Sequence, residues 1–146
     1  MKKQISIELN KYLANVGVSY IKLHNLHWNV AGKDFKAVHE YLESLYNAFA
    51  DVLDEVAELL KINGYYPAAS LKEYLELAEI KELSSEERNS RDVIAIVLED
   101  MKLLKALAEK IRKEANEEDD YAVVSAMEDD LKQYSKNIWF LESMLK

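Results

Sequence analysis

The sequence predicts an all-α protein made of four long helices and one short helix. Only three Gly and one Pro occur among its 146 residues, which leaves little material for turns or a sheet. Apolar residues recur at alternating spacings of three and four along four long segments, the repeat of helices that bury one face. The chain is 49% hydrophobic and 32% charged. We expect a single domain spanning residues 1–146, long enough for a sizeable core.

The first helix is predicted from about Ile5 to Ala31, and Gly32 is a plausible C-terminal cap. Its apolar stripe consists of Leu9, Leu13, Val16, Tyr20 and Leu23.

The second helix is predicted from Phe35 to Leu60, with Asp34 as its N-terminal cap. The turn residues 63–67 (Asn-Gly-Tyr-Tyr-Pro) end it firmly. Its seam has the spacing of helix-bundle packing and consists of Phe35, Val38, Leu42, Leu45, Phe49, Val52, Val56 and Leu59.

A short amphipathic segment from Leu71 to Ile80 stands alone in the middle connection.

The third helix is expected to start near Ser84 or Ser90, because Ser84 with Glu87 fits a capping box. Its stripe is Val93, Val97, Met101, Leu104 and Ile111, and that of the fourth is Val124, Met127, Leu131, Tyr134, Ile138, Leu141 and Leu145. Two long hairpins joined by a long crossover resemble a ferritin-like four-helix bundle, with a short extra helix in the crossover.

Four residues suggest a metal site shared between two copies of the chain: His27, His39, Asp54 and Glu58. Asp54 and Glu58 are four apart and project from one helical face. At ~1.5 Å rise per residue, His39 lies ~22 Å from Asp54 along the same helix, too far to share an ion. If two such helices pack antiparallel about a twofold axis, the His39 end of one meets the carboxylate end of the other. Glu43, four after His39, adds a second carboxylate beside the histidine.

The spacing excludes a metal site at the centre of the bundle. Ordinary ferritin-like di-iron proteins use Glu-x-x-His motifs on two helices. Here the residues three positions before His24, His27 and His39 are Ile21, His24 and Lys36. An outer-face site at a subunit interface remains possible.

The net charge of −8 argues against nucleic acid as an obvious partner, because phosphate binding needs a basic patch. The stretch from Glu114 to Asp130 carries eight acids and no Lys or Arg. It is either a solvated loop with the start of a helix, or a region that attracts cations.

The chain has no Cys, so it has no disulfides, Cys-ligated zinc or iron–sulfur cluster. No apolar run approaches the ~18 residues of a membrane span, and Glu8 interrupts the segment where a signal peptide would be apolar. These features favour a cytoplasmic protein without a membrane partner.

An ordered set of motifs resembles the Dps proteins, the miniferritins named as DNA-binding proteins from starved cells. The similarity begins with residues 22–32 (Lys-Leu-His-Asn-Leu-His-Trp-Asn-Val-Ala-Gly) and 35–40 (Phe-Lys-Ala-Val-His-Glu). It continues through residues 54–58 (Asp-Glu-Val-Ala-Glu), 64–67 (Gly-Tyr-Tyr-Pro), 71–75 (Leu-Lys-Glu-Tyr-Leu) and 139–143 (Trp-Phe-Leu-Glu-Ser). The motifs occur in the right order over nearly the whole chain.

The resemblance implies a hollow dodecamer that stores and detoxifies iron. Such a protein is a ferroxidase: it oxidises Fe(II), preferentially with hydrogen peroxide, at two-iron centres between twofold-related subunits, and stores ferric mineral inside. His27 and His39 would come from one subunit, and Asp54 and Glu58 from its partner. Glu43 stands where the family commonly has Asp, which affects how the second iron is held. These ligand types suit iron, and zinc or manganese could substitute.

The family pattern also places Asp119 and Asp120 in an acidic pore through which iron enters, and Glu128 could continue the same face. Two other functions compete with iron storage. The chain could be a DNA-protecting nucleoid protein, but only two lysines precede the first helix, so the resemblance is to an acidic type without a basic DNA-binding tail and DNA binding should be weak. It could also be a non-catalytic oligomeric bundle whose acids only confer solubility.

Overall fold

The computed structural model describes all 146 residues and contains five helices. Two short strands accompany them, each of two residues. The elements in chain order are α1 (Lys3–Asn29), β1 (Val30–Ala31), α2 (Phe35–Ile62), α3 (Leu71–Leu77), β2 (Arg88–Asn89), α4 (Ser90–Glu117) and α5 (Tyr121–Met144). The predicted all-α class, with four long helices and a short one in the middle crossover, is confirmed.

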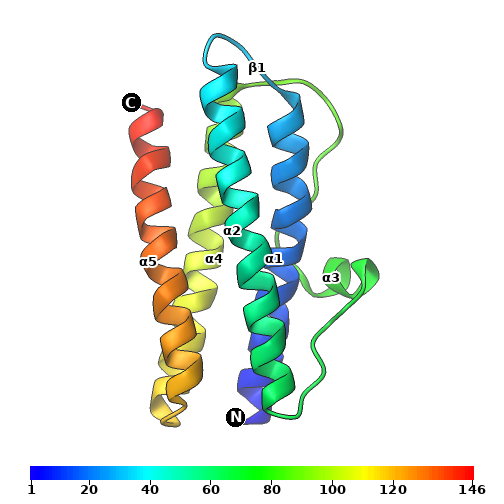
Figure 1. Cartoon of the computed structure of the whole chain (residues 1–146), viewed down its shortest axis with the longest axis vertical. Helices are drawn as coiled ribbons and strands as arrows, with labels where there is room; N and C mark the ends of the chain where they lie inside the picture. The colour runs from blue at the N-terminus through cyan, green and yellow to red at the C-terminus, as the bar shows by residue number, and fades with distance from the viewer.

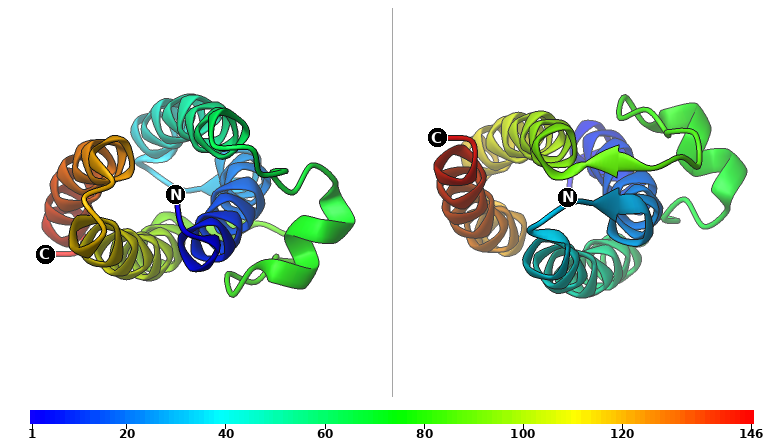
Figure 2. Two further views of the ribbon diagram at one scale, coloured as in Figure 1. Left: turned by 90° about the horizontal axis from the view of Figure 1, so that it is seen from below. Right: turned by 90° about the horizontal axis from the view of Figure 1, so that it is seen from above.

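The four long helices run side by side as two antiparallel hairpins, α1–α2 and α4–α5 (Figure 1). The crossover returns from the lower end of α2 to the upper end of α4 and carries α3 along the outside of α1 (Figures 1 and 2). Seen along the bundle, α1 and α5 lie diagonally opposite each other (Figure 2). No helix is both long and apolar enough to cross a bilayer.

A short parallel bridge fixes the upper end of the crossover. Val30 pairs with Arg88 and Ala31 with Asn89. The first helix therefore ends at Asn29 rather than at Ala31, because Val30 has left the helix and is extended. Gly32 is not the helix cap that we predicted: it lies beyond the bridge, at φ +131°. The sequence pattern did not indicate this bridge.

Two predicted helix caps also differ from the structure. Asp34 precedes α2, but its side chain accepts no capping hydrogen bond. Ser84 donates to Glu86 over 2.7 Å and starts no helix. The third long helix, α4, was predicted to start near Ser84 or Ser90, and it begins at Ser90. The Asn89 side chain caps it by accepting a hydrogen bond from the Asp92 N–H over 2.9 Å.

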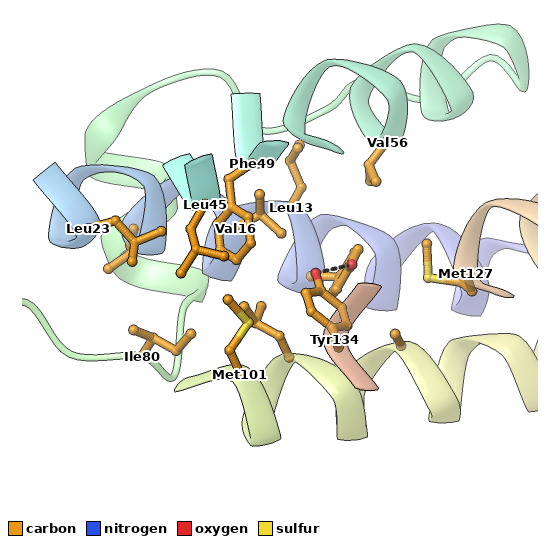
Figure 3. Packing of buried hydrophobic residues seen from close by; sticks show 14 of the residues in the cluster. Leu13, Val16, Leu23, Leu45, Phe49, Val56, Ile80, Met101, Met127 and Tyr134 are labelled. Atoms are coloured by element: carbon orange, nitrogen blue, oxygen red, sulfur yellow. Dashed lines mark hydrogen bonds between the residues drawn. The ribbon is translucent and has the colours of Figure 1, made fainter. Parts of the chain in front are cut away.

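The predicted stripes form the core (Figure 3). Most of their members are buried, while Phe35 at the start of α2 remains 39% exposed. Burying such side chains stabilises the fold by roughly 1.5–3 kcal/mol each. Figure 3 shows Leu13 and Val16 of α1, Leu45 and Phe49 of α2, and Met101 of α4 meeting in this core.

The short helix α3 is held from both of its ends. Ser70 caps it by accepting from the Glu73 N–H, and the Glu73 carboxylate accepts from the Ala69 N–H over 2.8 Å. Beyond the helix, Asn15 Oδ1 of α1 accepts from the N–H of Ile80 over 2.9 Å. A Cβ at Gly17 would lie 2.7 Å from Cδ2 of Tyr74, so the missing side chain lets α3 rest directly on α1.

One polar cluster interrupts the apolar core. Tyr12 and Tyr134 are fully buried, and Asp130 is only 7% exposed. The sequence pattern predicts that Asp130 belongs to a solvated or cation-attracting acidic run, and this prediction is wrong for Asp130. Its carboxylate faces the bundle interior, where it accepts from the Tyr12 hydroxyl over 2.7 Å. Burial is the main cause that raises the pKa of Asp130 to about 6.

Replacing Gly17 by Ala should loosen α3 without weakening α1. The new methyl group collides with the Tyr74 ring, while Ala adds about 1 kcal/mol of helix propensity over Gly. Hydrogen exchange should therefore quicken in residues 71–77 and not in α1. Unchanged exchange in α3 would show that Tyr74 does not depend on the glycine.

The buried carboxyl of Asp130 should make wild-type stability depend on pH. Its folded-state pKa of about 6 lies above the ordinary value of 3.8, so the folded protein holds this proton more tightly than the unfolded chain does. The protonated carboxyl therefore stabilises the fold at low pH, and this contribution is lost as the pH rises through 6. Between pH 4 and 7 the wild type should lose roughly 2.4 kcal/mol of unfolding free energy relative to Asp130→Asn. Thermal unfolding of both proteins across this range tests it. Parallel pH profiles would mean that Asp130 titrates normally.

Candidate metal centre

Two histidines from different helices meet at the upper end of the α1–α2 hairpin. His27 lies in the last turn of α1, and His39 lies in the second turn of α2. The Nδ1 atom of His27 is 2.7 Å from the carbonyl oxygen of His39, and Nδ1 of His39 is 2.8 Å from the carbonyl oxygen of His27. The rings stack with centroids 3.6 Å apart and planes 13° from parallel.

These reciprocal hydrogen bonds determine which nitrogen can bind a metal. A carbonyl oxygen only accepts, so Nδ1 of each ring must carry the proton. In the neutral imidazole, Nε2 then keeps its lone pair, the form in which histidine binds metals. His27 is buried and His39 is half-buried. The fold thus presents two oriented Nε2 ligands from one chain.

Glu43 lies one turn after His39 on α2, and its carboxylate is exposed. Its Oε1 accepts a hydrogen bond of 3.2 Å from the Tyr46 hydroxyl. Desolvation and the Glu43 charge raise the pKa of Tyr46, so this phenol stays a donor at neutral pH. Glu43 is therefore held beside the histidine pair by a neighbour on its own helix.

Tyr46 packs against the histidine pair, and no pattern in the sequence indicated it. Its ring stands edge-on to His27, with centroids 5.2 Å apart, and stacks on His24 at 3.8 Å. His24 is anchored through Nδ1 to the carbonyl oxygen of Tyr20 over 2.7 Å. Tyrosine is not a usual ligand type, so only its place seven residues after His39 could have indicated it.

The two predicted carboxylates lie apart from the histidines. Asp54 and Glu58 are exposed on α2 and form no salt bridge within the chain. No three His, Asp or Glu side chains of one chain come together as a metal site. The chain thus brings His27 and His39 together and leaves Asp54 and Glu58 on a distant part of the helix.

The predicted pore residues differ from one another in their surroundings. Asp120 caps α5 and lies 3.9 Å from the amino group of Met1. Glu128 lies 3.8 Å from Arg112. Asp119 is exposed in the turn between α4 and α5, with φ at 54°. Of the three, only Asp119 has no salt bridge with a cation of its own chain.

Comparison with known proteins identifies the family. Residues 8–146 match the ferritin-like domain family. The chain is 36% identical over 141 residues to the DNA protection during starvation protein of Helicobacter pylori, covering 96% of this chain and 98% of that protein.

Solved structures agree with this match. Antigen TpF1 of Treponema pallidum superposes with a TM-score of 0.96 at 36% identity, over 98% of this chain and 92% of that one. A Dps protein of Vibrio cholerae superposes with a TM-score of 0.95 at 28% identity, over 99% of this chain and 90% of that one. That protein is described as a member of a broad superfamily of ferritin-like diiron-carboxylate proteins. The predicted resemblance is confirmed: the chain belongs to the ferritin-like family, among the Dps proteins.

Proposed function

We propose that this protein is a ferroxidase that stores iron. It oxidises Fe(II) at centres between paired subunits and keeps the ferric product inside a hollow homo-oligomeric shell. The observation that carries the proposal is the His27–His39 pair, in which two reciprocal hydrogen bonds leave both Nε2 atoms free to bind a metal. Exposed carboxylates on α2, Asp54 and Glu58, supply the complementary ligand type.

The centre is completed by a second copy of the chain. Asp54 and Glu58 sit four residues apart on an exposed face of α2. An antiparallel pair of α2 helices about a twofold axis places these carboxylates opposite the histidines of the other copy, because a twofold interface brings the same two patches together twice. Each interface then contains two equivalent centres.

The ligand set suits ferrous iron, and zinc or manganese could replace it. Imidazole nitrogens bind the metal, and the carboxylates compensate the charge that rises when Fe(II) becomes Fe(III). With two ferrous ions, hydrogen peroxide is reduced without release of a radical: two Fe(II), one H₂O₂ and two protons give two Fe(III) and two waters. Glu43, held by Tyr46, is placed to help retain the second iron.

A dodecameric shell is the proposed assembly. The number of subunits rests on the resemblance to the Dps proteins, while the apolar side chains of α3 support contact between subunits: Leu71 is 70% and Leu75 is 51% exposed in the single chain. Apolar surface of this kind commonly marks protein contacts. Together with the capping that keeps α3 helical, this suggests that α3 lies against another subunit.

DNA protection appears in the name of the Helicobacter pylori relative. For this chain, the net charge of −8 opposes direct binding to phosphates. We therefore propose protection by removal of ferrous iron and peroxide, with DNA binding weak. A protein of this charge should not retard plasmid in a gel at physiological salt unless cations bridge them.

Co-assembly of two inactive variants should restore part of the ferroxidase activity. One chain carries His27→Ala with His39→Ala, and the other carries Asp54→Ala with Glu58→Ala. Random mixing makes half of the twofold interfaces heterotypic, and each of these contains one intact centre of two. Fe(II) oxidation by peroxide should therefore recover to about one quarter of the wild-type rate.

Shells made of either variant alone are the controls and should be inactive. Full assembly of the mixed shells must be verified by sizing with light scattering. Mixed shells that assemble fully yet oxidise no iron would contradict a centre shared between subunits.

Removing the acidic charges at the start of α5 should slow iron uptake at low salt. Asp119→Asn with Asp120→Asn deletes the charges and keeps the capping, because Asn also caps helices. Electrostatic steering of Fe(II) weakens with ionic strength, so wild type and variant should converge at high salt.

The matched control is Glu99→Gln with Glu109→Gln, which removes two exposed charges from α4. Stopped-flow absorbance of ferric product gives the rates. If the aspartate variant and the control are equally fast at low salt, Asp119 and Asp120 do not guide iron inward.

A further inference from the structure

Three polar side chains form a directed hydrogen-bond chain across the centre of the bundle. The Tyr12 hydroxyl of α1 donates to Asp130 Oδ2 of α5 over 2.7 Å, and it lies 2.5 Å from the Tyr134 hydroxyl. Figure 3 shows this hydroxyl contact at Tyr134, among apolar side chains. The single Tyr12 proton is already used on Asp130, so Tyr134 must be the donor to Tyr12. The chain runs from Tyr134 through Tyr12 to Asp130.

Stability alone does not account for this cluster. A buried carboxylate costs desolvation, and apolar replacement of a complete buried polar group can be neutral or stabilising. The two phenols have no access to solvent. The carboxyl pKa of about 6 leaves Asp130 mostly ionised at neutral pH, so it is able to accept a proton. Burial raises the pKa of both phenols, so each is protonated at rest, and only Tyr12 is placed to pass its proton directly to Asp130 when its ring is oxidised.

Aromatic side chains of α2 lie against both this cluster and the candidate metal centre. His27 contacts the edge of the Tyr46 ring at 5.2 Å. Phe49 follows Tyr46 by three residues, on a neighbouring position of α2. Phe49 in turn meets Tyr134 edge-on at 6.3 Å. Ring contacts therefore reach α2 from both sides, at Tyr46 from the histidine and at Phe49 from the buried phenol, and the two positions are three residues apart on that helix.

We propose that Tyr12 and Tyr134 form a buried redox site, with Asp130 as the proton acceptor, that takes up the oxidising equivalent of a hydroxyl-class radical. The oxidant rests on the proposed iron chemistry: a centre holding a single ferrous ion reduces peroxide by one electron and releases such a radical. The site converts this radical into hydroxide before the radical damages the shell or its surroundings.

The step balances in atoms and electrons. The radical gains one electron and becomes hydroxide. Tyr12 supplies this electron, its O–H bond breaks, and the proton forms a new O–H bond at Asp130 Oδ2. The phenoxyl oxygen of Tyr12 keeps the hydrogen bond from Tyr134, which stabilises it. A second ferrous ion then returns one electron to Tyr12 and becomes ferric, while Asp130 returns the proton.

The test uses iron-free, assembled protein at pH 8 and a photogenerated one-electron oxidant, ruthenium(III) tris-bipyridine. Electron paramagnetic resonance of rapidly frozen samples should show a long-lived neutral tyrosyl radical in the wild type. Tyr12→Phe and Asp130→Asn should each reduce its yield about tenfold or more, because either the phenol or the proton acceptor is lost. Tyr66→Phe, at a phenol 84% exposed, is the matched control and should leave the long-lived signal unchanged.

Absence of a long-lived radical in the wild type overturns the proposal, as does an unchanged signal in folded Tyr12→Phe or Asp130→Asn. If Tyr12→Phe does not fold, the nearly isosteric Asp130→Asn still decides the outcome. This experiment needs no iron, so it can fail while ferroxidase activity is present. It can equally succeed while the proposed ferroxidase activity is absent.

Discussion

Two hydrogen bonds across the turn between α1 and α2 join the architecture of this bundle to its chemistry. His27 and His39 each donate from Nδ1 to the other's backbone carbonyl, and their rings stack at 3.6 Å. This arrangement fixes the path of the hairpin and selects one tautomer for both rings. Because both protons are committed to the backbone, both Nε2 atoms keep a lone pair. The same two bonds therefore hold the hairpin together and orient the two nitrogens that we propose as metal ligands.

The length of α2 then requires the proposed centre to be shared between two chains. A helix of 28 residues keeps its ends far apart, and no metal site of three or more ligands forms within one chain. The histidines stay at one end of α2, and the exposed carboxylates Asp54 and Glu58 lie toward the other. In the proposed assembly, the activity depends on pairing of subunits, and α3, seated on α1 through Gly17, offers apolar surface for contacts between them.

Periodicity and residue type were sufficient to predict the helices and the hairpins, because those features depend on local spacing. The structure brings His27 and His39 together, while the role of the candidate ligands stays a prediction. Features that depend on tertiary contact were missed. The bridge of Val30 with Arg88 joins segments that no local pattern relates. Asp130 looked like part of a solvated acidic run, yet the opposite helix places Tyr12 against it. Tyr46 was overlooked because its contribution is to hold Glu43 and support His27, which ligand spacing does not reveal.

The central claim, an iron centre built by two copies of the chain, is tested most directly by anomalous diffraction at the iron edge from crystals soaked anaerobically in Fe(II). We predict iron bound by Nε2 of His27 and of His39 in one subunit, with Asp54 and Glu58 of the twofold-related subunit completing the coordination. Iron bound by Nδ1, iron held by ligands of a single chain, or no iron at the histidine pair would contradict the account.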